Sequence, residues 1–150
     1  MLREDLSKWF KIDIESPYML LVTEIREDKK RIMTIEEEEL FGIDKLNVSR
    51  SLVPAITHVD YSSRIQTVDI QTNPTYHSII TNFKKKTGCP IVINTSFNIR
   101  GEPIVCSPTD AFQCFMGTGL DILVINNYFL KKEQQKINLS KNYKRKYPLD

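Results

Sequence analysis

The sequence lacks any long apolar run, and this excludes a membrane-spanning helix. Such a helix needs about 20 consecutive apolar residues, whereas polar or charged residues interrupt every apolar stretch here after a few positions. The N-terminal segment MLREDLSKWF also lacks the apolar core of a secretory signal. We therefore expect a cytoplasmic protein with no membrane partner.

Cysteine and histidine are scarce, which limits nucleophilic and metal chemistry. Cys89, Cys106 and Cys114 are odd in number and lack zinc-site spacing, so we expect free thiols in a reducing compartment. A catalytic cysteine would need a histidine nearby in the fold, and the chain offers only His58 and His77. We predict neither a cysteine nucleophile nor a metal site.

What the sequence does contain fits one folded domain. Its 150 residues are 41% hydrophobic and 27% charged, which is normal for a soluble globular chain that builds its core without disulfides or metal. The net charge of +2 is unevenly distributed along the chain. Residues 131–150 carry seven Lys or Arg and two acids, a net charge of +5, which leaves −3 for the other 130 residues. We predict a domain over 1–130 and a flexible basic tail over 131–150, and we favour a solvated tail over one that binds nucleic acid.

Apolar patterning predicts strands that alternate with helices. Residues 26–51 interrupt it as a charged excursion, which we interpret as a connecting loop with some helix; its four consecutive acids, Glu36 to Glu39, are interpreted as solvated surface rather than a cation site. The order of elements predicts a mixed-sheet α/β (α+β) domain with helices packed against the sheet. Strands are expected at 18–25, 54–60, 64–70, 91–93, 120–125 and 128–130, and helices at 3–10, 73–88 and 108–116.

The clearest helix starts at Asn73 and ends at Gly88. Apolar residues fall there at positions i, i+3, i+4 and i+7 and so form one stripe, which we expect to pack on the sheet. The residues of the stripe are Tyr76, Ile79, Ile80 and Phe83.

The stretch Pro90–Pro108 places a compact polar segment between two short apolar runs. Residues 91–93 suit a strand buried on both faces. The hydroxyl and amide side chains that follow can donate hydrogen bonds to an anion, while Gly101 permits close backbone approach and Arg100 offers donors for phosphate. An ordinary strand–turn–strand with a polar turn is the alternative. The polar residues are Asn94, Thr95, Ser96, Asn98, Arg100, Gly101 and Glu102.

A second polar group lies earlier in the chain. If residues 55–60 are extended, His58 and Asp60 share one face. Two residues cannot make a metal site, so a hydrogen-bonded structural histidine is favoured over a metal ligand. The loop 61–63, opposite Arg64, could hold a phosphate.

These residues carry a resemblance to a known family. Asn-Thr-Ser-Phe-Asn-Ile-Arg-Gly-Glu-Pro-Ile-Val at 94–105 resembles the signature of the NodU/CmcH-type O-carbamoyltransferases, near their C-terminal end. Ser96-Phe97-Asn98 with Gly101 and Pro103 also resembles the Ser-x-Asn-x-x-Gly-x-Pro segment of YrdC-like domains, which make carbamoyl- or threonylcarbamoyl-adenylate from ATP. The resemblance runs from about Ser16 to Lys132 and includes the blocks 16–20 and 58–68.

The resemblance implies a YrdC-like twisted mixed sheet and a site that forms carbamoyl-adenylate from carbamoyl phosphate and ATP, with Mg²⁺, for transfer to a hydroxyl of a small molecule or sugar. It implies Arg64 and Ser96 as the catalytic residues. Ser96 is expected to donate to a phosphate, because no base is visible that would make it a nucleophile. Glu102 is expected to orient Arg100 or a backbone group rather than bind magnesium. Substrate or nucleotide binding is implied for Asn94, Thr95, Asn98, Arg100, Gly101 and His58.

The sequence also departs from the family. The Lys/Arg-rich segments that resemble V-K-x-R-E and R-P-F-A-P, and the histidine-bearing transfer domain, are not in it. Either a transferase domain or chain supplies them as a partner, or the chain is a fragment, or the chemistry is lost. Two other functions stay open: a nucleotide- or anion-binding module without turnover, and an RNA-binding accessory domain that uses the basic tail.

Overall fold

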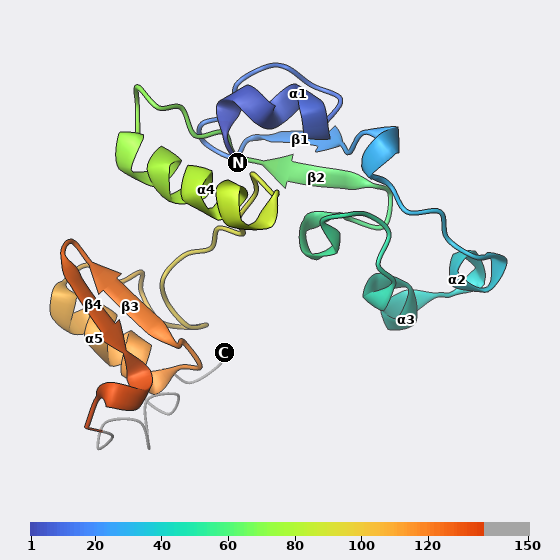
Figure 1. The fold of residues 1–150 in the computed structure, drawn as a ribbon. Coiled ribbons are helices and arrows are strands. Elements are labelled where there is room, and N and C mark those ends of the chain that lie inside the picture. Colours follow the sequence, from blue (N-terminus) through green and yellow to red (C-terminus); the bar gives the residue numbers. More distant parts are fainter. Residues whose placement is uncertain (137–150) are drawn as a thin grey trace. The chain divides into compact units, whose positions relative to one another are not determined.

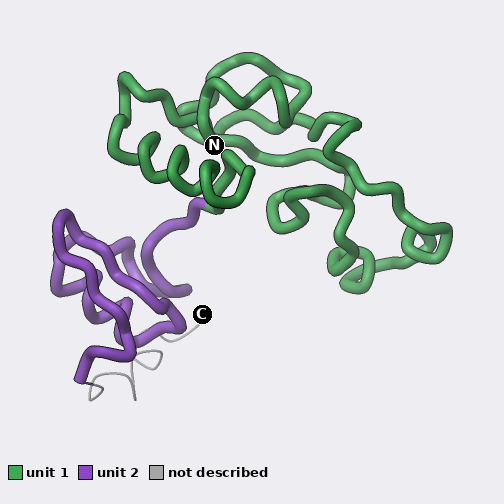
Figure 2. Tube along the Cα trace, viewed as in Figure 1, with its two compact units in different colours: residues 1–93 green, residues 94–150 purple. Residues whose placement is uncertain are grey.

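A computed structural model of the protein describes residues 1–136. The chain divides into two compact units, Met1–Ile93 and Asn94–Asp150, which Figure 2 shows in green and purple. Each unit is described by itself below. The predicted basic tail lies outside the described residues from position 137 onward.

The first unit is built around a two-stranded antiparallel sheet. Strand β1 (Leu21–Glu24) pairs with β2 (Ser62–Ile65), with Leu21 opposite Ile65. Figure 1 shows the short N-terminal helix and the long helix α4 beside this sheet. The helical elements of the unit are η1 (Arg3–Asp5), α1 (Leu6–Trp9), η2 (Glu27–Lys29), α2 (Ile35–Glu39), α3 (Gly42–Asn47), η3 (Pro54–Ile56) and α4 (Pro74–Thr87).

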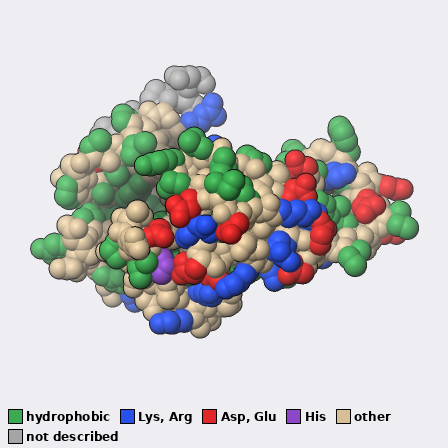
Figure 3. All heavy atoms as spheres, turned by 90° about the horizontal axis from the view of Figure 1, so that it is seen from above, with side chains coloured by type: hydrophobic (Ala, Val, Ile, Leu, Met, Phe, Trp, Pro, Cys, Tyr) green, Lys and Arg blue, Asp and Glu red, His purple; other side chains and the backbone are tan. Residues whose placement is uncertain are grey.

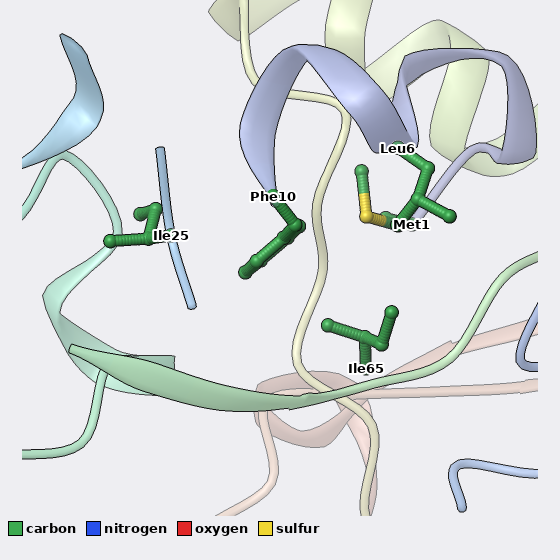
Figure 4. Packing of buried hydrophobic residues seen from close by; sticks show 5 residues of the cluster. All are labelled: Met1, Leu6, Phe10, Ile25 and Ile65. Carbon is green, nitrogen blue, oxygen red and sulfur yellow. The ribbon is translucent and has the colours of Figure 1, made fainter. Parts of the chain in front are cut away.

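The core of the first unit forms where the N-terminal segment meets the sheet. Its buried side chains, drawn in Figure 4, come from the start of the chain, from α1 and the residue after it, from β2 and from the residue that follows β1. A second cluster joins Leu2, Val68 and Ile80, and Leu2 pairs with Val68 in a parallel bridge. The members of the first cluster are Met1, Leu6, Phe10, Ile25 and Ile65.

Helix α4 confirms the predicted boundaries but not the whole predicted stripe. The side chain of Asn73 accepts the N–H of Tyr76 at 3.1 Å, and Gly88 ends the helix with a φ of +78°. Ile80 is fully buried, whereas Ile79 is 58% exposed. The prediction that Ile79 packs on the sheet is therefore wrong. The reason is that α4 packs on the Leu2–Val68 segment through Ile80, instead of lying on a broad sheet that would cover more of its surface.

The second unit packs one helix on a two-stranded sheet. Helix α5 (Pro108–Gly117) lies against β3 (Ile122–Ile125), which pairs antiparallel with β4 (Tyr128–Lys131), and η4 (Lys132–Gln134) follows. Ser107 caps α5 through a reciprocal capping box with Asp110. The core consists of Ala111, Phe115, Met116 and Leu123.

The mixed α/β class is confirmed, because helices accompany small antiparallel sheets and no barrel closes. Two predicted strands are wrong. Residues 54–56 form a 3₁₀ helix, which Pro54 favours at its first position since proline fixes φ and lacks an N–H. Residues 91–93 bury Ile91 and Val92 only in part and pair with no neighbouring strand among the described residues.

Three other predicted strands are shorter than expected: β1, β2 and β3. Strand β2 ends at Ile65, not at residue 70. In β3 only Leu123 is buried, while Ile122 and Val124 are 48% and 60% exposed, because α5 covers a single face of the sheet. None of the described helices is long and apolar enough to span a membrane.

Candidate functional site

The polar segment 94–102 forms a loop without helix or strand, and Glu102 organises its second half. The Glu102 carboxylate accepts the backbone N–H of Ile99 at 2.9 Å, and the N–H of Glu102 donates to the carbonyl of Ile99 at 3.0 Å. The Asn98 amide donates to the carbonyls of Ile99 and Glu102 at 3.2 and 2.8 Å. Gly101 has a φ of +81°, which a residue with a side chain rarely adopts. The loop is therefore a tight, internally bonded turn.

Glu102 contributes more to the structure of the loop than the sequence pattern indicated. It is buried, at 8% exposed, and its bond to Ile99 confirms the prediction that it orients a backbone group. Burial, together with a hydrogen bond to Glu102, raises the pKa of the Cys114 thiol to about 11. Cys114 is thus a buried thiol that stays neutral near pH 7.

A hollow of about 560 Å³ adjoins this loop within the second unit. Thr95, Ser96 and Asn98 of the loop and Thr118 after α5 supply its polar side chains, and much of the rest is apolar. The exposed face of β3 contributes Ile122 and Val124. A pocket that combines an apolar wall with a few fixed polar groups is the usual form of a small-molecule site.

The remaining predicted residues of the loop lie at its surface. Asn94, Thr95, Ser96 and Arg100 are all exposed. The Arg100 side chain has no hydrogen bond or ion pair with any described residue. A guanidinium in this state offers five donors to an incoming anion.

In the first unit, Arg64 lies on the outward face of β2, and His58 contacts Ser62 of the same strand. Ser63 and Ile65 are buried, so Ser62 and Arg64 point the other way. The His58 ring Nδ1 and the Ser62 hydroxyl lie 2.8 Å apart, and the His58 N–H donates to the Ser62 carbonyl at 2.8 Å. Ser62 therefore ties His58 to the strand that carries Arg64, a role that the sequence analysis missed.

Arg64 is exposed and pairs across the sheet with Val22. Like Arg100, it makes no side-chain hydrogen bond or ion pair within residues 1–136. The other described arginines all have partners: Arg3, Arg26 and Arg31 bind carboxylates, and Arg50 donates to a backbone carbonyl.

The expected pairing of His58 with Asp60 on one strand face is wrong, because residues 58–61 form a turn. Asp60 accepts the N–H of Ser62 at 3.0 Å, and hydrogen bonds from Ser62 lower the pKa of its carboxyl. Tyr61 adopts a φ of +63° in this turn. Among the described residues, no group of three or more His, Cys, Asp or Glu side chains could hold a metal ion.

Two sequence blocks that carry the resemblance meet in the first unit. Ser16 donates its N–H to the Thr67 hydroxyl at 2.9 Å and its hydroxyl to the carbonyl of Ile65 at 3.0 Å. The Gln66 amide donates to the carbonyl of Pro17 at 2.8 Å. These bonds fix the end of β2, and with it the backbone that follows Arg64. A hollow of about 650 Å³ lies beside them.

The predicted site residues thus fall into two groups. His58 and Arg64 belong to the first unit, and the residues of the loop belong to the second. The loop residues are brought together around one hollow: Asn98, Ser96 and Thr95 line it, and Arg100 and Gly101 follow in the same turn. Their roles as catalytic or binding residues stay predictions.

Comparison with known proteins identifies what the chain is similar to. Residues 1–132 match the family model described as carbamoyltransferase C-terminus. The chain is 52% identical to the uncharacterized protein sll1178 of Synechocystis over 90% of its own length and 22% of that protein. It is 38% identical to nodulation protein NolNO of Sinorhizobium fredii over 88% of its own length and 17% of that protein. It is 29% identical to the 3'-hydroxymethylcephem-O-carbamoyltransferase of Amycolatopsis lactamdurans over 87% of its own length and 21% of that protein. The chain therefore spans about a fifth of the length of these relatives.

Proposed function

Since this chain belongs to the carbamoyltransferase C-terminus family, we propose that it is the part of an O-carbamoyltransferase that binds carbamoyl phosphate and ATP. One observation carries the proposal: Arg64 and Arg100 are the two arginines that make no side-chain hydrogen bond or ion pair within the described residues. Exposed guanidinium groups without an internal carboxylate are free to bind phosphate in a bidentate manner.

The proposed reaction is the formation of carbamoyl-adenylate. Carbamoyl phosphate and water give carbamate and phosphate; a carbamate oxygen then bonds to the α-phosphorus of ATP, while the bond to the departing pyrophosphate breaks. A hydroxyl of a small molecule or sugar later bonds to the carbamoyl carbon and loses its proton, while the bond to AMP breaks and AMP leaves. Negative charge accumulates on phosphate oxygens throughout, so fixed cations and N–H or O–H donors stabilise the transition state.

Each proposed residue has a role that suits its position. Arg64 binds a phosphate from the outward face of β2, and Ser96 donates its hydroxyl to a phosphate oxygen. Thr95 and Arg100 add donors from the same loop. Asn98 uses its amide N–H groups on the carbonyls of Ile99 and Glu102, which leaves its amide oxygen as the atom that accepts a hydrogen bond from the nucleotide.

The hollow of the second unit suits the base of a nucleotide. Its apolar lining, including Ile122 and Val124, can pack against a planar ring, and polar side chains of the loop line the same hollow. Mg²⁺ would neutralise charge on the triphosphate. Because Mg²⁺ is usually held through the substrate phosphates and only one or two carboxylates, we expect the metal to arrive bound to ATP.

The test is a titration of the 15N-labelled chain with ATP, and separately with carbamoyl phosphate, followed by backbone NMR shifts. We expect weak, salt-sensitive binding that perturbs residues 58–68 and 94–102. Arg64→Ala should nearly abolish the shifts and Ser96→Ala should weaken them.

Arg26→Ala is the matched control, because it removes the same charge from an arginine that is already paired with Asp28. Shifts confined to residues 131–150 would contradict the assignment and favour the RNA-binding alternative. A module that binds both ligands but never supports turnover with its partner present would be the non-catalytic alternative.

A further inference from the structure

A projecting segment of the first unit, residues 30–52, is called the arm here. Its root is a short antiparallel pairing: Lys30 forms a bridge with Ser51, and the N–H of Arg31 donates to the carbonyl of Arg50 at 2.9 Å. Its tip, residues 32–47, contains the two short helices α2 and α3. Figure 1 shows this tip extending away from β1 and β2.

The tip exposes an unusual amount of apolar surface. Neither α2 nor α3 contains a buried residue. Large apolar side chains that would normally lie in a core are in contact with water over most of their area. A group of exposed apolar residues of this size, next to charged ones, is typical of an interaction surface. The most exposed are Ile32 at 94%, Phe41 at 92%, Ile43 at 75%, Ile35 at 74% and Leu46 at 62%.

Specific polar bonds hold the arm in shape. Thr34 caps α2 through a reciprocal capping box with Glu37, and Glu37 forms an ion pair with Arg31 at 2.7 Å. The Lys45 ammonium donates to the carbonyl of Glu38 at 3.0 Å, and the buried Arg50 guanidinium donates to the carbonyl of Lys45. These bonds do not bury the apolar side chains; they present them in a fixed arrangement, which lowers the entropy cost of binding.

Charge on the tip indicates what kind of surface it fits. Glu36, Glu38 and Glu39 lie beside the apolar residues and form no ion pair with any described residue. Figure 3 shows acidic and hydrophobic side chains next to one another at the end of the molecule that carries α2 and α3. Two copies of the tip facing each other would bring these carboxylates together, which disfavours self-association. The complementary surface is apolar with Lys or Arg at its rim.

We propose that the arm is the docking surface for the rest of a carbamoyltransferase, the part of the enzyme that lies outside the matched segment in the relatives. This inference rests on the proposed function. The segment that matches this chain is about a fifth of each relative's length. The relatives therefore contain ample further polypeptide to cover such a surface.

Docking on the arm would also reach the candidate site. A hollow of about 500 Å³ is lined by Leu46 of α3 and by His58, Val59 and Asp60. A partner side chain that covers Leu46 would therefore lie beside His58, which is tied through Ser62 to the strand of Arg64. The partner would in this way bring its own donors or cations to the edge of the phosphate-binding residues.

The experiment co-expresses the 150-residue chain with the portion of the Synechocystis relative that lies outside the matched segment. We expect a one-to-one complex in light scattering and slower amide hydrogen exchange at residues 31–49 in the complex than in the chain alone. The double variant Phe41→Glu/Ile43→Glu should weaken the complex at least tenfold. Its melting temperature should match that of the unaltered chain, because neither side chain is buried.

The double variant Ile14→Glu/Leu20→Glu is the matched control: it adds the same two charges at apolar residues that are 67% and 79% exposed outside the arm, and it should leave affinity within twofold. The proposal is overturned if no complex forms, if the arm variant binds as well as the unaltered chain, or if slowed exchange is confined to residues 94–125. It is equally overturned if the arm variant abolishes a dimer of this chain alone. The ATP titration of the isolated chain is independent of these results, so a failure of docking can be separated from a failure of the proposed function.

Discussion

At the scale of single residues, Asp5 shows how a buried charge joins distant parts of the first unit. Its side chain is only 3% exposed and accepts hydrogen bonds from Lys84 of α4 at 2.6 Å and from Lys8 at 3.0 Å. Burial alone would raise the pKa of the Asp5 carboxyl, but the two ammonium groups outweigh it and lower the pKa below its ordinary value. The N-terminal helix and α4 are thus joined by an ion pair as well as by apolar contacts.

Replacing Lys84 with Met should therefore destabilise the protein by about 1–3 kcal/mol, because it leaves a buried acceptor with one donor fewer. The free energy of unfolding from urea melts at pH 7 would measure this. Lys85→Met removes the same charge from the next position of α4, which has no ion pair with a described residue, and should change stability by less than about 0.5 kcal/mol. Equal losses in the two variants would show that the Asp5–Lys84 contact contributes nothing.

The pH dependence of this contact has a defined sign. Because the folded pKa of Asp5 lies below its ordinary value of 3.8, the unfolded chain binds more protons between the two values, and stability rises with pH there. The contribution is fully present above the unfolded pKa and is lost as pH falls through the folded pKa. The difference in unfolding free energy between the unaltered chain and Lys84→Met should hence shrink from pH 5 to pH 3. A constant difference would contradict the assignment.

Cys114 leads to a prediction of chemical reactivity. A thiol with its pKa raised to about 11 by burial and by Glu102 carries almost no thiolate at pH 8, and the thiolate is the reactive form. Iodoacetamide at pH 8 should label the exposed Cys106 well before Cys114, as read by peptide mass spectrometry. The control is labelling in about 6 M guanidinium chloride, which unfolds ordinary domains. All three cysteines should then react.

At the scale of elements, two adjacent isoleucines of α4 differ in burial. Ile80→Ala should cost about 2–5 kcal/mol, the usual loss when a large core side chain is removed, because Ile80 is fully buried against Leu2 and Val68. Ile79→Ala makes the same chemical change at a side chain that is 58% exposed, so the loss should be under about 1 kcal/mol. Denaturant melts of the two variants would measure these losses of unfolding free energy. A larger loss for Ile79→Ala would mean that the face of α4 that carries Ile79 is covered.

The helices could be predicted from the sequence because their ends are coded locally. Asn73-Pro74 and Gly88 set the bounds of α4, and Ser107 with Asp110 sets the start of α5, through hydrogen bonds made within four residues. The strands could not be predicted in the same way. Residues 91–93 have a strand-like composition, but a strand also needs a neighbour to bond with, and composition carries no information about that neighbour.

The candidate site was predictable in its residue types but not in its internal bonds. The loop 94–102 stood out as a polar segment with a glycine, and Gly101 does adopt a positive φ. That Glu102 would bond to Ile99, and Ser62 to His58, depended on the path of the turn rather than on any pattern. The division of the predicted residues between two units is likewise a property of long-range packing.

At the scale of the whole molecule, the proposed adenylation would require more fixed charge than the described residues present. Transfer at the α-phosphorus of ATP needs several fixed cations, and removing a single preorganised donor from such a site typically costs about 10²–10³ in rate. The described residues present Arg64 and Arg100 as arginines without an internal partner. About four-fifths of the length of each relative lies outside the matched segment, and further cations can reside there.

The 150-residue chain alone should therefore show little or no exchange of labelled pyrophosphate into ATP in the presence of carbamoyl phosphate, even where NMR detects binding of both ligands. Adding the rest of a carbamoyltransferase should restore exchange, and Arg64→Ala should remove it again, whereas the control Arg26→Ala should not. Robust exchange by the isolated chain would contradict this expectation. It would mean that the isolated chain already provides enough fixed cations and hydrogen-bond donors to stabilise the transition state at the α-phosphorus.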